Sequence, residues 1–244
     1  IAIVASELGK AVSKETRVDI LVTPLVTIFS GVGLSMLIAA PIGAAASQVG
    51  TLIMWATEQA PLVMGILVSV IVGVALTLPI SSAAICAALG LTGLAGGAAV
   101  AGCCAQMIGF AVMSYKENGV GGLVSQGLGT SMLQMGNIVK NPRIWIAPTL
   151  ASAITGPLAT CVFHFEMNGA AVSSGMGTCG LVGQIGVYTG WVSDIAAGVK
   201  TAITPMDWAA MVLLCFVLPA VLSVIFCEIE RKLGWIKEGD LKLN

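Results

Sequence analysis

The fold class of this chain is decided by residues 59–115, which read QAPLVMGILVSVIVGVALTLPISSAAICAALGLTGLAGGAAVAGCCAQMIGFAVMSY. The stretch contains no charged residue, and it is longer than two membrane-spanning helices of about 20 residues each require. Its apolar residues run continuously and do not alternate with polar ones, which argues against the strands of a membrane β-barrel. We therefore expect an all-α polytopic membrane protein, with spans over about 61–78 and 84–114 that are divided at Pro79.

The composition of the whole chain supports this fold class. Of its 244 residues, 57% are hydrophobic and only 9% are charged, against about 25% charged residues in an average soluble domain. So few charges cannot cover the surface of a soluble protein. This excludes an ordinary soluble enzyme, a disordered chain and a secreted disulfide scaffold. The formal net charge is −1, so no nucleic-acid partner is expected.

Further apolar segments raise the expected total to about six to eight membrane-embedded helical segments. Residues 20–57 carry no charge. We expect Pro24 and Pro41 to break this segment into one helix over about 22–46 and a loop or tilted continuation. The other segments long enough for one span are residues 144–163 and 208–227.

The charged residues mark the ends of the membrane region. We expect a polar interfacial segment over residues 1–19, a membrane transport domain over 20–230 and a cytoplasmic tail over 231–244. The positive-inside rule places the tail in the cytoplasm because it is rich in Lys and Arg. Its basic residues are Arg231, Lys232, Lys237 and Lys242. Because residue 1 is Ile and not Met, we expect that N-terminal sequence is missing.

Two segments, 118–137 and 164–190, are too rich in Gly and polar residues for ordinary spans. Non-helical backbone is tolerated at membrane depth only where it is buried in protein or lines a cavity, and such broken segments bind substrates in transporters. We interpret both as re-entrant segments, with soluble loops as the alternative. The uncharged side chains that could bind a solute are Gln106, Gln126, Gln134, Asn137, Asn168 and Gln184.

Glu166 is the only acidic residue between Glu117 and Asp194. An ionisable group within such an apolar region is a functional candidate by default. Its carboxylate can accept two hydrogen bonds from neighbouring hydroxyl groups of a sugar. His164 lies two residues earlier and could bind a hydroxyl group or titrate near neutral pH. A solvated loop that carries both residues is the alternative interpretation.

Small residues recur at every fourth position in three places, which puts each set on one face of a helix. Such faces allow helix backbones to approach closely in lipid. We expect these faces to be buried at helix contacts, some of them in a homodimer. The sets are Gly31, Ser35, Ala39 and Gly43; Gly65, Ser69, Gly73 and Thr77; and Gly93, Gly97, Ala101, Ala105 and Gly109.

The sequence offers little for metal or cofactor chemistry. It contains one His and seven Cys, and no two Cys have the CxxC spacing of a zinc or redox site. We therefore expect no metal and no cofactor. Residues 175–180 match the GxGxxG pattern, but a dinucleotide site needs a preceding strand, and the flanking residues are of the membrane type.

Five motifs taken together resemble one family. They are TLPISSAA over 77–84, GCCAQM over 102–107, QGLGTSMLQ over 126–134, NPRIWIAPTLAS over 141–152 and GMGTCGLVGQIG over 175–186. Over about residues 20–230 the chain resembles the IIC-type membrane component of the bacterial sugar phosphotransferase system. Within that family it resembles the branch that includes perfringolysin O regulator-like proteins.

The resemblance implies a homodimeric sugar permease of the bacterial inner membrane, with a static dimer-forming part and a moving transport part in each protomer. Two re-entrant hairpins would cradle the sugar, and a Glu and a nearby His would contact its hydroxyl groups. Glu166 matches this Glu, with Asn168 beside it, whereas the spacing of His164 departs from the family pattern. No IIA or IIB domain follows residue 230, so phosphotransfer would need separate IIA and IIB proteins.

We therefore expect a membrane permease, and not an enzyme, that translocates a sugar or a similar small polar solute across the lipid bilayer. The alternative is a membrane-embedded ligand sensor or regulator that transports nothing. Solute uptake into sealed vesicles distinguishes the two functions.

Overall fold

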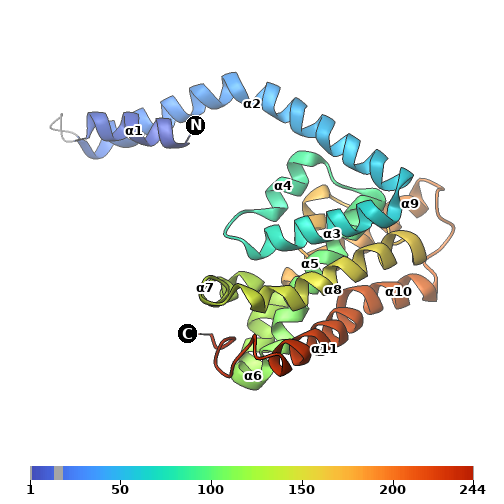
Figure 1. Ribbon diagram of the computed structural model, residues 1–244. Coiled ribbons are helices and arrows are strands. Elements are labelled where there is room, and N and C mark those ends of the chain that lie inside the picture. Colours follow the sequence, from blue (N-terminus) through green and yellow to red (C-terminus); the bar gives the residue numbers. More distant parts are fainter. Residues whose placement is uncertain (1, 14–18, 244) are drawn as a thin grey trace. The chain divides into compact units, whose positions relative to one another are not determined.

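The computed structural model describes residues 2–13 and 19–243, and these residues are predominantly helical (Figure 1). Within these two ranges no β-strand occurs, and the single β-bridge pairs Gly93 with Met167. The predicted all-α fold class is therefore confirmed. The chain divides into two compact units, residues 1–48 and residues 49–244.

The first unit is built from α1 (Ala2–Val12) and the greater part of α2 (Asp19–Gln59). The two helices are packed together: a Cβ atom on Gly9 would lie against the side chain of Thr27, and one on Gly31 would lie 3.4 Å from Ala5 Cβ. The sequence predicts that residues 1–19 form a polar interfacial segment. In the part of it that the structure describes, residues 2–12 form α1 and Asp19 begins α2.

The prediction that prolines break the segment 20–57 is wrong, because α2 continues through both Pro24 and Pro41. A proline removes one backbone hydrogen bond of the helix. In an apolar segment no water competes for the remaining ones, and the helix persists.

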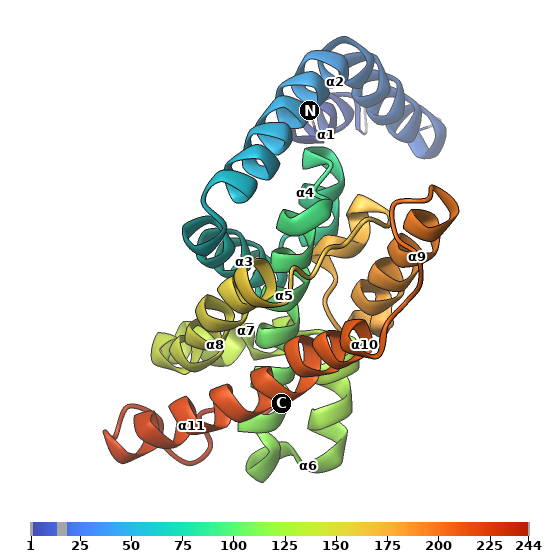
Figure 2. The same cartoon turned by 90° about the vertical axis from the view of Figure 1, so that its right-hand side faces the viewer.

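The second unit is arranged around α5 (Gly93–Met113), which is almost completely buried. Three helices pack against it: α3 (Pro61–Thr77), α8 (Ile146–Pro157) and α11 (Leu218–Lys232) (Figures 1 and 2). A helix surrounded in this way must be apolar on all sides, and α5 carries no charged residue.

Small residues set the distance between α3 and α5. A Cβ atom on Gly102 would overlap the carbonyl oxygen of Ser69, and one on Gly73 would lie 2.8 Å from that of Gly102. The predicted small-residue face of α3 is therefore buried, and part of it lies against α5. The α5 residue at this contact, Gly102, lies outside the predicted α5 set, whose members Gly97 and Gly109 lie instead against Phe165 and Ser223. In the first unit, by contrast, nothing lies within 4 Å of a Cβ atom on Gly43.

The span expected over 84–114 is two helices, α4 (Ser82–Leu89) and α5. The break occurs at Gly90, whose φ of 62° ends α4 in the left-handed conformation. Ser81 begins α4 by accepting a hydrogen bond from the amide of Ala84. The capping residues Ser81 and Gly90 thus divide a stretch whose continuous apolar sequence predicted a single span.

The two Gly-rich segments are irregular, as the sequence predicts. The first comprises α6 (Tyr115–Val124), a π-helical turn (Ser125–Gly129), a 3₁₀ turn (Ser131–Gln134) and α7 (Met135–Lys140). The second turns at His164, is non-helical over residues 165–168, continues through two 3₁₀ turns (Ala171–Gly175 and Cys179–Leu181) and enters α9 (Val182–Ala196).

Among the residues that the structure describes, three helical stretches are long and apolar enough to cross a membrane, namely Gly93–Met113, Pro142–Val162 and Pro205–Lys232. The last comprises α10 (Pro205–Val212), a π-helical turn (Leu213–Val217) and α11. Two shorter apolar helical stretches are Val22–Gly33 and Pro61–Thr77. These segments agree with the spans expected at 61–78, 144–163 and 208–227.

Candidate functional site

A polar cavity of about 300 Å³ lies where the second Gly-rich segment meets α9 and α10. Both residues that the sequence singled out as ionisable, His164 and Glu166, line it. The other lining residues are Phe163, Phe165, Trp191, Asp194, Val199, Lys200, Met206, Asp207 and Ala210.

Backbone contacts with α5 hold the segment that carries Glu166. The amide of Gly93 donates to the carbonyl of Met167 at 2.9 Å, and the amide of Met167 donates back at 3.0 Å. In extended backbone successive side chains point to opposite sides, and Phe165 and Met167 are buried while Glu166 is exposed. The alternation of apolar and polar residues therefore directs Glu166 away from the core.

Asn168 links two carboxylates of this site. Its Nδ2 donates to Glu166 Oε2 at 3.1 Å and to Asp194 Oδ2 at 2.9 Å. An amide has two N–H donors, so it can serve both acceptors at once. In the described part of the chain no donor contacts the other oxygen of Glu166, so that oxygen is free to accept a hydrogen bond from a solute.

Lys200 and Asp207 form an ion pair on the other side of the cavity, with 2.7 Å between Nζ and Oδ1. The ammonium group also lies 5.2 Å from the ring centroid of Trp191, a cation–π distance. Trp191 contacts Trp208 edge to face, with 5.6 Å between the ring centroids. The indole rings thus fix the position of Lys200.

His164 is one of two residues other than Gly that have a positive φ within the described ranges, at 45°. This conformation costs a residue with a side chain about 1–2 kcal/mol. Such strain concentrates at functional sites. The strained backbone turns the chain at the edge of the cavity, directly before the extended segment.

Gln106 lies elsewhere, in a buried network between α3, α5 and α8. Its Oε1 accepts from Trp145 Nε1 at 3.0 Å and from the hydroxyl of Thr77 at 3.3 Å. Its Nε2 donates to the hydroxyl of Thr149 at 3.3 Å. Gln106 therefore joins three helices and is separate from the polar cavity.

Gln126, Gln134 and Asn137 form a third group, which is occupied by the C-terminal segment of the chain. Gln134 Nε2 donates to Gln126 Oε1 at 2.9 Å and to the carbonyl of Leu241 at 3.0 Å. Asn137 Nδ2 donates to the carbonyl of Lys242 at 3.0 Å. These amides bind the protein's own backbone in this structure.

Gln184 is placed apart from all of these residues, on α9. Its Nε2 donates to Cys104 Sγ at 3.2 Å, and its buried Oε1 has no hydrogen-bond partner in the described part of the chain. Of the predicted set, the structure therefore places only Glu166, Asn168 and His164 at the polar cavity.

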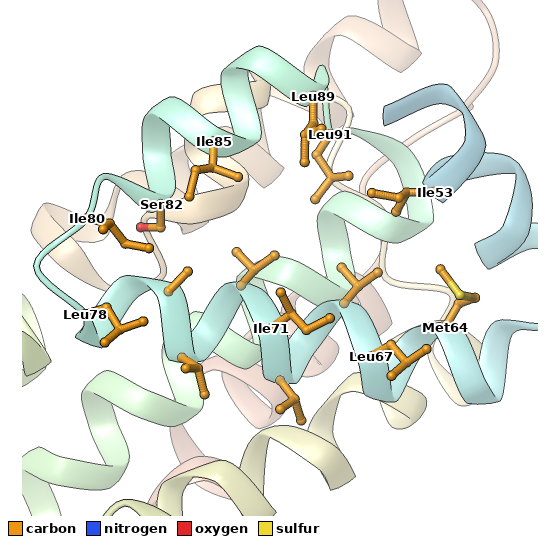
Figure 3. A pocket seen from close by; sticks show the side chains of 15 residues that line it. Ile53, Met64, Leu67, Ile71, Leu78, Ile80, Ser82, Ile85, Leu89 and Leu91 are labelled. Carbon is orange, nitrogen blue, oxygen red and sulfur yellow. The ribbon is translucent and has the colours of Figure 1, made fainter. Parts of the chain in front are cut away.

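A second cavity, of about 530 Å³ and thus larger than the polar one, lies between α3 and α4 (Figure 3). Figure 3 shows apolar side chains such as Leu67, Ile71 and Ile85 around it. Its one polar lining residue, Ser82, donates its hydroxyl to the carbonyl of Gly175 at 2.7 Å. Without a free polar group this cavity cannot recognise hydroxyl groups, so we assign the site to the smaller polar cavity.

Sequence analysis did not assign Asp194, Lys200 and Asp207 to the site. Asp194 lies near the end of α9, Lys200 in the connection and Asp207 in the first turn of α10, where it forms a capping box with Thr204. The helix pair brings these charges to the cavity.

Comparison with known families gives one match. The family described as "Phosphotransferase system, EIIC" matches residues 1–243. No curated protein and no solved structure matches the chain.

Proposed function

Because this chain belongs to the EIIC family of the phosphotransferase system, we propose that it is a permease for a sugar or a similar small polar solute, and that the polar cavity is its binding site. The observation that carries this proposal is the pair of carboxylates held by Asn168 at one cavity wall. Carboxylates accept hydroxyl hydrogen bonds, and charged acceptors strengthen each one.

The charges of the cavity favour a neutral solute over an anionic one. Three carboxylates, Glu166, Asp194 and Asp207, face one ammonium group, Lys200. Such a surface repels an anion, including a phosphorylated sugar. We infer that an unphosphorylated sugar binds here and that a phosphorylated product is released.

The proposed assembly comprises two copies of this chain and separate partner proteins. We infer a homodimer in the bacterial cytoplasmic membrane, with residues 20–230 as the transport domain and with separate IIA and IIB proteins as partners in phosphotransfer. Chemical cross-linking in native membranes tests the dimer. A strictly monomeric particle in lipid would count against it.

Glu166→Gln is the variant that tests the binding site. The amide keeps the shape of the side chain and removes its charge, so the protein should fold. The loss of a charged acceptor costs about 1–3 kcal/mol, or roughly 5- to 150-fold in solute affinity. The measurement is the uptake of a panel of labelled sugars into sealed vesicles, together with binding to the purified protein.

The matched control is Glu238→Gln, which removes an exposed carboxylate outside the cavity. It should leave affinity and uptake unchanged. Normal transport by Glu166→Gln would move the site away from this cavity. Binding without uptake by the unaltered protein would favour the sensor function.

A further inference from the structure

Helix α11 buries one face, and the last residue of that face is acidic. The buried residues are Pro219, Ser223, Cys227 and Glu230, whose spacing of four, four and three places them on one side of the helix. Glu230 is only 4% exposed. Neither of its carboxylate oxygens has a hydrogen-bond partner among the residues that the structure describes.

The elements packed against α11 offer no charge to Glu230. They are α5, α8 and the π-helical turn Leu213–Val217, and none of the three contains a charged residue. One turn before Glu230, Cys227 belongs to an apolar cluster. The buried members of this cluster include Phe110, Ile144, Ile236 and Leu241.

The charged groups of the neighbouring loops and of α6 are engaged elsewhere or exposed. Lys116 pairs with Glu228 at 2.8 Å, and Arg231 pairs with Glu117 at 3.0 Å. Arg143 lies over the ring of Trp235, and Asp240 accepts hydrogen bonds from Asn141 and from the amide of Lys237. The exposed ones are Lys140, Lys232, Lys237, Glu238 and Lys242.

The C-terminal tail, residues 233–243, folds back beside Glu230. The amide of Trp235 donates to the backbone carbonyl of Glu230 at 2.9 Å, and Ile236 and Leu241 are 3% and 0% exposed. Uncharged side-chain amides hold the tail backbone. These bonds run from Asn118 and Gln134 to the carbonyl of Leu241, from Asn137 to that of Lys242 and from Asn141 to that of Trp235.

From this arrangement we propose that Glu230 is a proton-binding site: it holds a proton while the tail is docked, and loss of that proton undocks the tail. An ionised carboxylate buried without a donor or a cation is very costly, and such a group takes up a proton instead. Ile236 and Leu241 are buried in the same apolar cluster as Cys227, one turn before Glu230; in this proposal the docked tail keeps water from the carboxyl group, so ionisation requires the tail to open. Two carboxylates also hold the tail: Glu117 accepts from the amide of Gly239 at 3.3 Å, and Asp240 accepts from Asn141 at 2.9 Å. Protonation of either one would weaken docking at low pH, so a loss of docking at high pH is assigned to Glu230.

The sign of the effect follows from proton linkage. The docked state binds one proton more than the undocked state, so raising the pH favours undocking. The contribution of Glu230 to docking is therefore strongest at low pH and weakens as the pH rises.

The test is hydrogen exchange of the tail amides in the full chain in lipid, corrected for the intrinsic pH dependence of exchange. Between about pH 5 and about pH 9, protection of residues 235–243 should fall by on the order of tenfold or more. In Glu230→Gln, which is neutral at every pH, protection should stay high throughout. Glu228→Gln is the control: it lies two residues away, pairs with Lys116 at the surface and should keep the unaltered pH dependence.

Three outcomes overturn the proposal. They are protection that does not depend on pH, the same pH dependence in Glu230→Gln, and protection that follows the sodium or potassium concentration and not the pH. Infrared spectroscopy of the unaltered protein supplies a second measurement that does not depend on how the variant folds. At pH 7 the C=O stretch of a protonated carboxylic acid must be present, and its absence would also overturn the proposal.

Discussion

At the scale of single residues, Asn168 connects two carboxylates that line the polar cavity. It is the shared donor to Glu166 and Asp194, which are 28 positions apart in sequence and belong to a loop and to α9. Two carboxylates brought this close repel each other unless a donor lies between them. The amide therefore stabilises the site as well as shaping it.

Asn168→Asp should damage the cavity although it hardly changes the size of the side chain. The substitution removes the shared donor and adds another carboxylate beside Glu166 and Asp194. We expect solute affinity to fall by roughly 5- to 150-fold, the equivalent of about 1–3 kcal/mol. Solute binding to the purified protein measures this loss, and unchanged affinity would show that Asn168 does not organise the site.

Gln106→Leu should act on stability and not on solute binding. The change leaves Trp145 Nε1 without its acceptor in a buried network, which costs about 1–3 kcal/mol. Thermal unfolding measures the loss. Reduced solute binding with normal stability would place Gln106 on the transport path.

At the scale of elements, the contact between α3 and α5 depends on glycine. The backbones approach so closely at Gly102 that a Cβ atom would overlap the carbonyl of Ser69. In lipid there is little hydrophobic drive between helices, so close packing of this kind supplies much of the association. The pattern of small residues at every fourth position predicted the α3 side of this contact, Ser69 and Gly73, but not Gly102 on the α5 side.

Gly102→Ala should therefore push α3 and α5 apart and destabilise the protein by about 1–3 kcal/mol. The matched control is Gly121→Ala, in α6, where nothing lies within 4 Å of the added Cβ atom. The control should be neutral or stabilising by about 0.4–1 kcal/mol. Thermal unfolding of both variants measures the difference in their stability. Equal stability of the two would argue against close packing at Gly102.

At the scale of the whole molecule, the distribution of charge predicts how the chain lies in the membrane. Lys and Arg concentrate after the last apolar helix, so the positive-inside rule places the C-terminal tail in the cytoplasm. The connection between α9 and α10 precedes that helix and should lie on the outer side. The polar cavity includes Val199 and Lys200 of this connection.

Cysteine labelling of intact cells tests this orientation. A membrane-impermeant reagent should modify a cysteine at the exposed position Val199 but not one at the exposed position Glu238. Permeabilised cells should show labelling at both positions. The reverse pattern in intact cells would contradict the predicted topology.

The sequence by itself determined the helical class, the main apolar spans, the buried small-residue face of α3 and the candidate pair Glu166 and Asn168. These features depend on the composition of short segments and on the spacing of their apolar and small residues, and both can be read from the sequence without knowledge of distant contacts. Only the tertiary structure decided which polar residues meet: Asp194, Lys200 and Asp207 at the cavity, and Gln134 and Asn137 with the tail. An amide or a carboxylate can be satisfied by many partners, and packing between distant segments selects one of them.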